Sequence, residues 1–416
     1  MTTADLVSSG FEIVTRDAAE FDWSAWNHLV DGNGIYARSE WVRPHLPPGA
    51  RVLEVRDASG ALAGALAYWL AEHPPTAWVD PYEQFLQVDP RWRPAMVGEL
   101  TPELNPATAW MPFDQPTGAV DPHAFFPALL CGQAGTEENH LVIRADMRRG
   151  EVIRALLAQL EDDARRCGAR CVLFPYYPVA DAAGISEAAP DYLPLFMYPR
   201  HHITVPPTFD EYLQSLQSRA RSDARRRQRA YLGSGCRTVE LDCHARGPEI
   251  RALFQRHAEK HGEIDADVAM GDLSIPGLTA LVLGTLFEDR LIGVAHFFAL
   301  DRAWQSHHIG FADELAKQAR AYFNLTYYDP IRLAAERQIR TIDYRYWFSH
   351  TKISIGATAS PRFFVVRCFD RALHDHLRPT ARRAMRALEM LETLLASHRR
   401  DSPEVAEAIQ LTSRWV

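Results

Sequence analysis

The order of the secondary-structure patterns is the feature that most limits what this chain of 416 residues can fold into. Short strand patterns alternate with amphipathic helix patterns over residues 10–180, and again over residues 200–370. Such alternation favours an α/β fold, with helices flanking a central mixed sheet. Because the order is similar in the two spans, and because the length favours two domains over one, the sequence predicts two α/β lobes of related plan.

Local patterns predict the individual elements of each lobe. In the first lobe they are strands over 11–14, 51–56, 61–70, 141–144 and 171–174, and helices over 22–30 and 152–167. In the second lobe they are strands over 201–205, 238–243, 291–300, 303–310, 341–345 and 362–368, and helices from 208, over 249–262, over 277–287 and over 319–338. Asp22 and Thr208 are predicted helix caps, and Pro330 predicts a break in the last of these helices. Residues 74–122, which are rich in Pro and Trp, predict loops and irregular strands.

A stretch rich in Pro, Ala and Gly, from Pro175 to Pro199, predicts the junction between the lobes. We therefore expect an N-terminal domain over 1–190, a C-terminal domain over 191–372 that carries the site, and a helical extension over 373–416. The long helix of this extension, over 373–398, is expected to be interrupted at Pro379.

Composition narrows the class of protein. The apolar and charged contents, 47% and 24%, are ordinary for a soluble globular protein, and the net charge of −8 argues against general nucleic-acid binding. The N-terminus lacks the pattern of a secretory leader, and the longest apolar runs are far shorter than the ~20 residues of a membrane span, so we expect a cytoplasmic protein. Six cysteines without zinc spacing predict reduced thiols, no metal site and no cofactor.

One strongly basic segment stands out against the negative net charge. Six arginines fall within eleven residues of the predicted helix that precedes Gly233. Arg225 and Arg229 lie four residues apart on one helix face, close to Arg226, and like charges at this spacing repel each other unless an anion is bound. The segment is therefore either a solvated helix face paired with acids or a site for an anion such as the phosphates of tRNA, coenzyme A or a nucleotide-linked acceptor.

The segment from Leu291 onward carries a resemblance. A strand that contains Gly293, a second strand, a loop, an Asn-Leu-x-Tyr-Tyr segment from Asn324, a strand ending at Asp343, and then Lys352 and Gly356 follow one another. This order resembles the C-terminal half of a GNAT-type acyltransferase domain, and more closely the Fem-like double-GNAT proteins of peptidoglycan biosynthesis. The match covers roughly residues 205–368, whereas the N-terminal half matches only in organisation.

The arginine segment fits the same resemblance, because a Ser- and Arg-rich helix opens the second domain of Fem-like proteins. Ser218, Arg221, Arg225 and Arg226 carry that likeness. The resemblance implies two GNAT-like domains in tandem and an amide-forming acyltransferase. Its donor would be an aminoacyl-tRNA or an acyl thioester, and its acceptor a small-molecule amine such as a cell-wall precursor or a specialised metabolite.

One loop of the sequence differs from that of single-domain acetyltransferases, and this difference narrows the choice of donor. These hold the coenzyme A pyrophosphate on a Gln/Arg-x-x-Gly-x-Gly/Ala loop at a helix N-terminus. The nearest string here runs from Ala230 to Gly235, has Ala at its first position and ends a helix instead of starting one. We therefore favour aminoacyl-tRNA over coenzyme A as the donor.

Three residues are predicted to be catalytic. Lys352 occupies the place where the family has a lysine near the reacting carbonyl, and a fixed cation there would stabilise an oxyanion. Asp343, at a strand end, would orient Lys352 or accept a proton. His307 and His308 fall on opposite faces of a strand, and we expect His308 to be the base. The alternatives are a surface lysine, an aspartate that caps the following turn, and a buried core histidine.

The remaining candidates are predicted to bind substrate. Asn324, Tyr327 and Tyr328 lie early in the long helix that should face the donor, where their polar groups would position a carbonyl or a phosphate. One of the two tyrosines is expected to be packed in the core. His350 lies on the loop beside Lys352. No cysteine is supported as a nucleophile, and the oligomeric state is left open.

Two other functions fit the same fold. The first is an acyltransferase that uses a thioester on coenzyme A or on a carrier protein. The second is a non-catalytic module that recognises a glycan or nucleotide precursor. The identity of the donor and the consumption of an amine acceptor separate these possibilities.

Overall fold

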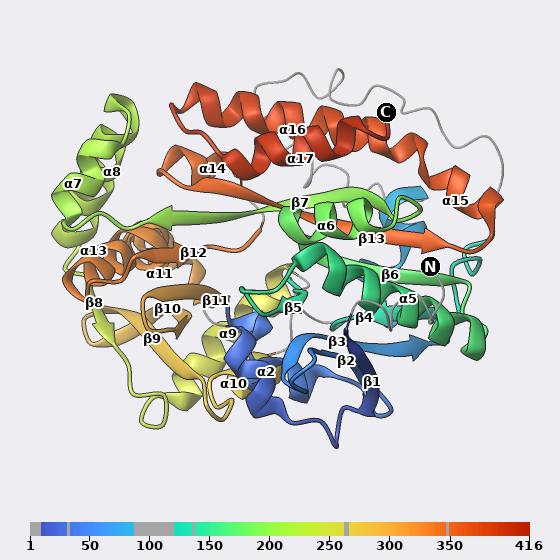
Figure 1. Cartoon of the computed structure of the whole chain (residues 1–416). Helices are drawn as coiled ribbons and strands as arrows, with labels where there is room; N and C mark the ends of the chain where they lie inside the picture. The colour runs from blue at the N-terminus through green and yellow to red at the C-terminus, as the bar shows by residue number, and fades with distance from the viewer. Residues whose placement is uncertain (1–9, 31–33, 87–119, 135–137, 262–265, 347–348) are drawn as a thin grey trace.

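The computed structural model describes residues 10–30, 34–86, 120–134, 138–261, 266–346 and 349–416. Among these residues, thirteen strands form one sheet against which the helices pack (Figure 1). Part of the predicted irregular region, residues 87–119, lies outside the described residues. No helix in the described ranges has both the length and the apolar character that crossing a membrane requires.

The two ends of the sheet repeat one plan, as the sequence predicts. At one end the order is β1-β2-β3-β4-β6, with antiparallel neighbours up to a parallel pair between β4 and β6. At the other end the order is β8-β9-β10-β11-β12, again antiparallel up to a parallel pair between β11 and β12. The first set is β1 (Glu12–Asp17), β2 (Arg51–Arg56), β3 (Leu62–Ala71), β4 (Ala128–Cys131), β5 (Val142–Ile143, beside β3) and β6 (Cys171–Pro178). The second set is β8 (Arg237–Glu240), β9 (Thr279–Phe287), β10 (Arg290–Ala299), β11 (Ala303–Phe311) and β12 (Thr341–Asp343).

Two long strands join these ends by crossing over. β7 (Leu193–Thr204) follows the first half in the chain but pairs with β12 of the second half. β13 (Thr358–Cys368) follows the second half but pairs with β6 of the first. The two strands also pair with each other, antiparallel, at the centre of the sheet. Each half is therefore completed by the final strand of the other half.

Helices cover both ends and the centre of this sheet. Those of the first half are α2 (Trp23–Leu29), α3 (Ser39–Val42), α5 (Arg149–Cys167) and α6 (Val179–Ala188). Those of the second half are α7 (Phe209–Ser215), α8 (Ser218–Gly233), α9 (Gly247–His261), α10 (Ala266–Asp272), α11 (Asp313–Gln318), α12 (Ala321–Phe323), a π-helical turn (Asn324–Tyr328), α13 (Asp329–Glu336) and α14 (Ser349–Ser354). The extension supplies α15 (Arg371–Leu377), α16 (Pro379–Ser397) and α17 (Pro403–Ser413). Figure 1 shows α16 and α17 side by side, and they pack on β7 and β13.

Several local predictions are confirmed. Asp22 caps α2 by accepting a hydrogen bond from Ser24 N, and Thr208 caps α7 by accepting one from Glu211 N. The extension breaks at Pro379, which opens α16. Pro330 lies in the first turn of α13, directly after the π-helical turn Asn324–Tyr328, so the helix changes its hydrogen-bonding pattern next to this proline.

The prediction of a helix over 277–287 is wrong, because these residues form β9. A short apolar run has no period that separates a buried strand from a helix. The close packing of this strand requires a residue without a side chain at Gly284, because a Cβ there would lie 2.6 Å from Leu241 Cδ1 and 2.7 Å from Leu291 Cδ1. The predicted junction is also ordered, because it contains the end of β6, all of α6 and the start of β7.

Asp80 gives a first prediction about stability. Its carboxylate is buried and accepts a hydrogen bond from Tyr82 N at 2.9 Å. Burial, with the charge of Glu83 nearby, raises the pKa of Asp80 from 3.8 to about 6. Between those two values the folded protein binds more protons than the unfolded chain, so this carboxyl makes the protein less stable as the pH rises. Asp80→Asn keeps the acceptor oxygen but cannot ionise.

The quantity of interest is the melting temperature of Asp80→Asn minus that of the original protein. We expect this difference to be larger at pH 7.5 than at pH 4 by about 2 °C or more. Thermal unfolding followed by circular dichroism at both pH values measures this difference. Asp289→Asn, at an exposed position, is the control and should show no such change. An equal effect of Asp80→Asn at the two pH values would contradict the prediction.

Candidate functional site

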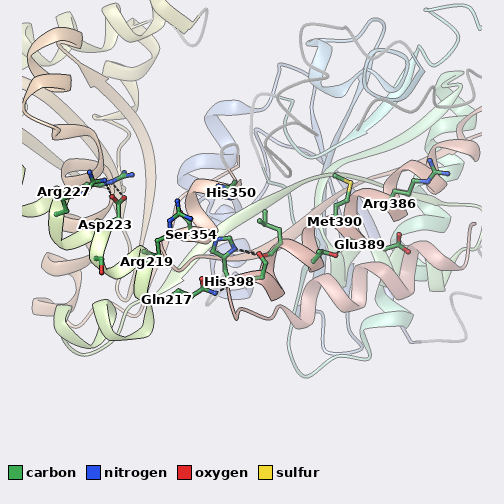
Figure 2. Close-up of a pocket in the computed structure, with 16 residues that line it drawn as sticks. Gln217, Arg219, Asp223, Arg227, His350, Ser354, Arg386, Glu389, Met390 and His398 are labelled. Carbon is green, nitrogen blue, oxygen red and sulfur yellow. Dashed lines mark hydrogen bonds and ion pairs between the residues drawn. The ribbon is translucent and has the colours of Figure 1, made fainter. Parts of the chain in front are cut away.

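A pocket of about 1350 Å³ lies between the arginine helix and the C-terminal extension. α8 forms one wall, α16 forms the opposite wall, and α14 contributes His350 and Ser354 (Figure 2). Its charged lining residues are Arg219, Asp223, Arg226, Arg227, Arg386 and Glu389. We call this space the basic pocket, because its arginines outnumber its acids.

Ion pairs neutralise only part of the arginine helix. Asp223 pairs with both Arg226 and Arg227, and its pKa is lowered because these two cations outweigh the effect of burial. Arg227 also lies over the ring of Phe323, at 3.4 Å from the ring centre. Among the described residues, Arg225 and Arg229 are exposed and form no ion pair. The alternative of a helix face paired with acids therefore holds for Arg226 and Arg227, whereas the anion site stays a prediction.

The C-terminal extension closes the pocket from the other side. Gln217 Nε2 donates to Ser397 O at 2.8 Å, which ties the start of α8 to the end of α16. The rings of His350 and His398 meet edge to face, with their centres 5.6 Å apart. Arg386 of α16 adds a cation opposite α8 and forms no ion pair within the described part of the chain. Arg386 was not predicted from the sequence, because nothing local in α16 shows that it faces the arginine helix.

Lys352 lies on α14 with His350, but its side chain turns into the protein. Its Nζ donates to Tyr344 O at 2.6 Å and also to Tyr346 O. Lys352 is only 5% exposed, so the alternative of a surface lysine is wrong. Its ammonium fixes the segment that follows β12, and its catalytic role stays a prediction.

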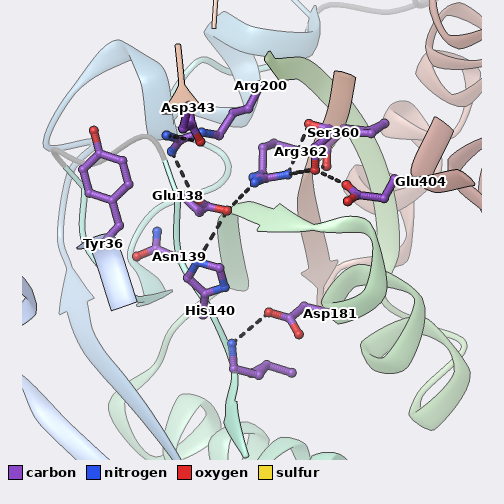
Figure 3. Close-up of polar contacts among 12 residues, drawn as sticks. Tyr36, Glu138, Asn139, His140, Asp181, Arg200, Asp343, Ser360, Arg362 and Glu404 are labelled. Carbon is purple, nitrogen blue, oxygen red and sulfur yellow. Dashed lines mark hydrogen bonds and ion pairs between the residues drawn. The ribbon is translucent and has the colours of Figure 1, made fainter. Parts of the chain in front are cut away.

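Asp343 lies at the partly exposed edge of an ion cluster that consists of Glu138, Arg200, Asp343 and Arg362, with the buried Glu138 at its centre (Figure 3). Arg200, on β7, reaches Glu138 Oε2 with Nη1 and Asp343 Oδ2 with Nη2, both at 2.9 Å. Arg362, on β13, pairs with the other oxygen of Glu138. Asp343 Oδ1 also accepts a hydrogen bond from Arg345 N at 2.6 Å, which confirms the alternative that Asp343 caps the following turn.

The charges of this ion cluster depend on one another. Burial would raise the pKa of Glu138, but the guanidinium groups of Arg362 and Arg200 lower it to about 2. Glu138 precedes β5 in the first half, whereas Asp343 ends β12 in the second. Arg200 therefore connects the two halves through its side chain as well as through the strand that carries it.

The prediction that His307 and His308 lie on opposite faces of β11 is wrong. Nε2 of each ring lies 2.8 Å from Oδ2 of Asp272, at the end of α10. The pairing of β10 with β11 shifts register there, because Ala295 opposes Ile309 but Phe297 opposes Ser306. Two residues of β11 thus oppose one residue of β10, and this β-bulge turns both imidazoles toward the same carboxylate.

His308 is 8% exposed, so it is buried, as the alternative of a core histidine predicts. Its hydrogen bond to Asp272 nevertheless makes it part of a polar cluster. Burial lowers the pKa of His307 to about 4, with His308 adding to the shift. Arg345 of the second half donates from Nη1 to His307 O and thereby links the bulge to the turn after β12. Its backbone has φ 62, in the left-handed region that residues other than Gly rarely adopt.

The three residues predicted to face the donor are in the core of the second half. Tyr327 and Tyr328 are each 1% exposed, so both are packed, and Asn324 donates from Nδ2 to Arg320 O at 3.1 Å. None of the three lines the basic pocket. The rings of Tyr327 and Tyr328 lie 5.8 and 6.2 Å from that of Phe323, which in turn supports Arg227.

The structure therefore brings the candidates together in two groups. Arg226 and His350 line the basic pocket, with Lys352 behind it on α14. Asp343 and His308 lie on the paired strands β12 and β11, although the partner of Asp343 in that ladder is Gln305 and not His308.

No family model and no curated protein matches this sequence. Solved structures do match, and the comparison with the crystal structure of FemX gives a TM-score of 0.55. That match covers 88% of this chain and 99% of the FemX chain, at 11% sequence identity. The chain therefore has the fold of FemX, with two GNAT-like halves in tandem and a mixed sheet flanked by helices.

Two further structures match with TM-scores below 0.5. One is a tandem GNAT protein from the clavulanic acid biosynthesis pathway, with a TM-score of 0.41 and 14% identity over 86% of this chain and 98% of that one. The other is L-PGS from Bacillus licheniformis, with a TM-score of 0.41 and 9% identity over 61% of this chain and 82% of that one.

Proposed function

We propose that this protein is an amide-forming transferase that moves an aminoacyl or acyl group from a phosphate-bearing donor to an amine. The observation that carries the proposal is the basic pocket, which lies beside the arginine helix in a chain with the fold of FemX. Arg219, Arg226 and Arg386 face this space in a protein whose net charge is −8. A local excess of guanidinium groups is suited to phosphate recognition.

Aminoacyl-tRNA is the proposed donor. The string from Ala230 to Gly235 forms the end of α8, where free backbone carbonyls, and not N–H groups, point away from the helix. It therefore lacks the N–H groups that cradle a pyrophosphate at a helix N-terminus. Arg225 and Arg229, exposed on the same helix, extend the basic surface beyond the pocket and would follow a nucleic-acid backbone.

The transfer itself forms a C–N bond and breaks the ester that links the acyl group to the donor. We assign the proton of the attacking amine to His308, whose Nε2 is oriented by Asp272, and His308 would pass this proton to the oxygen of the departing donor. Lys352 would stabilise the oxyanion, with a substrate oxygen replacing one of its carbonyl partners. Asp343 holds Arg345 and Arg200 in place.

The residues of the core play a supporting part in this proposal. Tyr327 and Tyr328 position Phe323, and through it Arg227, on the wall of the basic pocket. Asn324 fixes the helical turn that carries them by binding Arg320 O. His350, at the pocket itself, would contact the acceptor or the acyl group.

A donor screen by mass spectrometry tests the proposal. The purified protein is incubated with a mixture of amine acceptors and, separately, with aminoacyl-tRNA, acyl-coenzyme A and an acyl carrier-protein thioester. Amide product from aminoacyl-tRNA alone supports the proposed donor, and product from a thioester would replace it. Tight binding of a precursor without product from any donor would contradict transferase activity and support a binding module.

Charge reversal on α8 gives a separate prediction about donor binding. The double variant Arg225→Glu and Arg229→Glu should weaken tRNA binding by about 10-fold or more, and should reduce the slope of log K against log salt by about one for each phosphate that the protein no longer neutralises. Arg226→Glu combined with Arg386→Glu tests the pocket walls in the same way. Fluorescence anisotropy with labelled tRNA at several salt concentrations measures both effects.

Arg371→Glu is the matched control, because Arg371 opens α15, which lies at the opposite end of the molecule from α8 in Figure 1. Binding and salt slope should be unchanged in this variant. If the double variants bind tRNA as the control does, the arginine helix is not the anion site.

A further inference from the structure

We propose that Asp272, His307 and His308 form a binding site for one divalent transition-metal ion, with Zn²⁺ as the ion that best fits the ligands. This histidine cluster lies where α10 meets β11, away from the residues that line the basic pocket. Its three potential ligand atoms lie within 4.8 Å of one another. The inference does not depend on the donor or the acceptor of the proposed transfer.

The β-bulge in β11 is what creates the ligand set. In a regular strand, neighbouring side chains point to opposite faces, so two consecutive histidines could not reach one ion. Here His307 and His308 together oppose the single residue His296 of β10. Bulges of this kind re-aim side chains, and they are frequent near functional sites. The paired orientation is thus a property of the backbone and not of two flexible side chains.

Close packing brings the third ligand to the bulge. α9 crosses β11 at Gly310, where an added Cβ would lie 2.6 Å from the backbone carbonyl carbon of Leu253. This contact places α9 over β11, and α10 packs against α9. Asp272, the last residue of α10, then reaches both imidazoles through Oδ2.

The distances suit an ion with nitrogen and oxygen ligands. Zn–N and Zn–O bonds measure about 2.0–2.2 Å, so the ligand atoms of a tetrahedral ion lie about 3.4 Å apart. The two Nε2 atoms now lie 2.8 Å from the carboxylate oxygen. The side chains therefore need to separate by only about half an ångström to admit the ion.

Unpartnered nitrogens around the cluster are a second, independent observation. Nδ1 of His307 and both ring nitrogens of His296 are buried and have no hydrogen-bond partner within the described structure. His296 is 0% exposed, and the centre of its ring lies 5.5 Å from that of His307. Buried polar atoms in proteins nearly always have a partner, and a bound ion or an ordered water commonly provides it where no side chain does.

The ligand types indicate the class of ion and its use. Two imidazoles and one carboxylate suit Zn²⁺ or Fe²⁺ better than Mg²⁺ or Ca²⁺, which prefer oxygen ligands only. Three protein ligands leave an open position for water or for a substrate oxygen. Each of the three residues is 8% exposed, so the site is buried without being sealed. Trp41 of α3 covers His307, with the ring centres 5.3 Å apart.

This metal site competes with the base role proposed for His308. An ion bound to Nε2 would replace the hydrogen bond to Asp272 that orients the ring, so the base role of His308 belongs to the metal-free protein and the ligand role to the metal-bound protein. Metal titration therefore distinguishes them. If the protein binds Zn²⁺ but transfers no acyl group, the metal site is supported and the proposed function is rejected.

The test measures metal bound to the full-length protein. The protein is stripped with a chelator, dialysed separately against Zn²⁺, Co²⁺ or Fe²⁺, and analysed by mass spectrometry of the elements. We expect about one ion per chain, and a Co²⁺ absorption spectrum typical of four or five ligands that include nitrogen. Asp272→Asn and His308→Gln should each weaken binding by more than about 100-fold.

His244→Gln is the matched control, since His244 is an exposed histidine before α9, and this variant should bind metal as the original protein does. Circular dichroism of each variant shows whether it is folded. Equal metal content in Asp272→Asn, His308→Gln and the control would place any bound ion elsewhere on the surface and overturn the site. The original protein tests the site even if a variant fails to fold. If the original protein binds no ion and shows no Co²⁺ band, the proposed metal site is wrong.

Discussion

Glu138→Gln is expected to lower the free energy of unfolding by about 3–5 kcal/mol. The carboxylate of Glu138 is paired with the guanidinium groups of Arg200 and Arg362, which are 1% and 6% exposed. An amide of the same shape removes the negative charge and leaves both cations buried without that partner. Breaking a buried ion pair in this way costs far more than losing an exposed one. Urea unfolding at pH 7 measures the change.

The pH dependence identifies the charge of Glu138 as the cause. Because the folded pKa of Glu138 is about 2, below its ordinary value of 4.5, its contribution is complete above pH 4.5 and is lost as the pH falls toward 2. The difference between the two proteins should therefore shrink over that range. Glu249→Gln, which breaks an exposed pair with Arg246, should change stability by less than about 0.5 kcal/mol. A Glu138→Gln variant as stable as this control would refute the argument.

Lys352→Met is expected to lower kcat of the proposed transfer by about 100-fold or more. Methionine fills much the same volume as lysine but removes the ammonium group. If the ammonium stabilises an oxyanion, the loss falls on kcat, whereas KM for the donor changes little. Steady-state kinetics with the donor identified in the screen measures both constants.

The alternative is that Lys352 acts only by holding the backbone at Tyr344 and Tyr346. In that case the loss of activity should follow the loss of stability, and it should recover at a lower temperature where the variant is fully folded. Lys317→Met, on α11, removes a lysine outside both groups of candidates and should retain full turnover. Normal turnover in Lys352→Met would remove this residue from the mechanism.

The fold was predictable to the extent that its determinants are local. Alternating patterns, the caps at Asp22 and Thr208, and the prolines at 330 and 379 mark elements that the structure contains. The order of these elements in two spans predicted two halves of related plan. Periodicity could not identify β9, since its burial on both faces removes the alternation by which a strand is recognised.

The site was less predictable, because its contacts join distant parts of the chain. Glu138 and Arg362 are 224 residues apart, and neither has a neighbour in the sequence that indicates a buried ion pair. The arginines of α8 were visible as a basic run, whereas the opposing wall on α16 was not. His307 and His308 were visible as a pair, but the shared direction of their side chains depends on a register shift between β10 and β11 that no single-strand pattern records.

The crossing of β7 and β13 has a consequence for how the protein is made. During synthesis, β6 ends at Pro178, but its sheet partner β13 is not finished until Cys368, 190 residues later. At about 5–20 residues per second, the ribosome takes roughly 10–40 s to supply it. Through that interval the nascent first half presents the open edge of an apolar strand, which is prone to pair with other chains. The central sheet of this protein is therefore completed only after β13 has left the ribosome, and chaperones that shield β6 would be needed most in that interval.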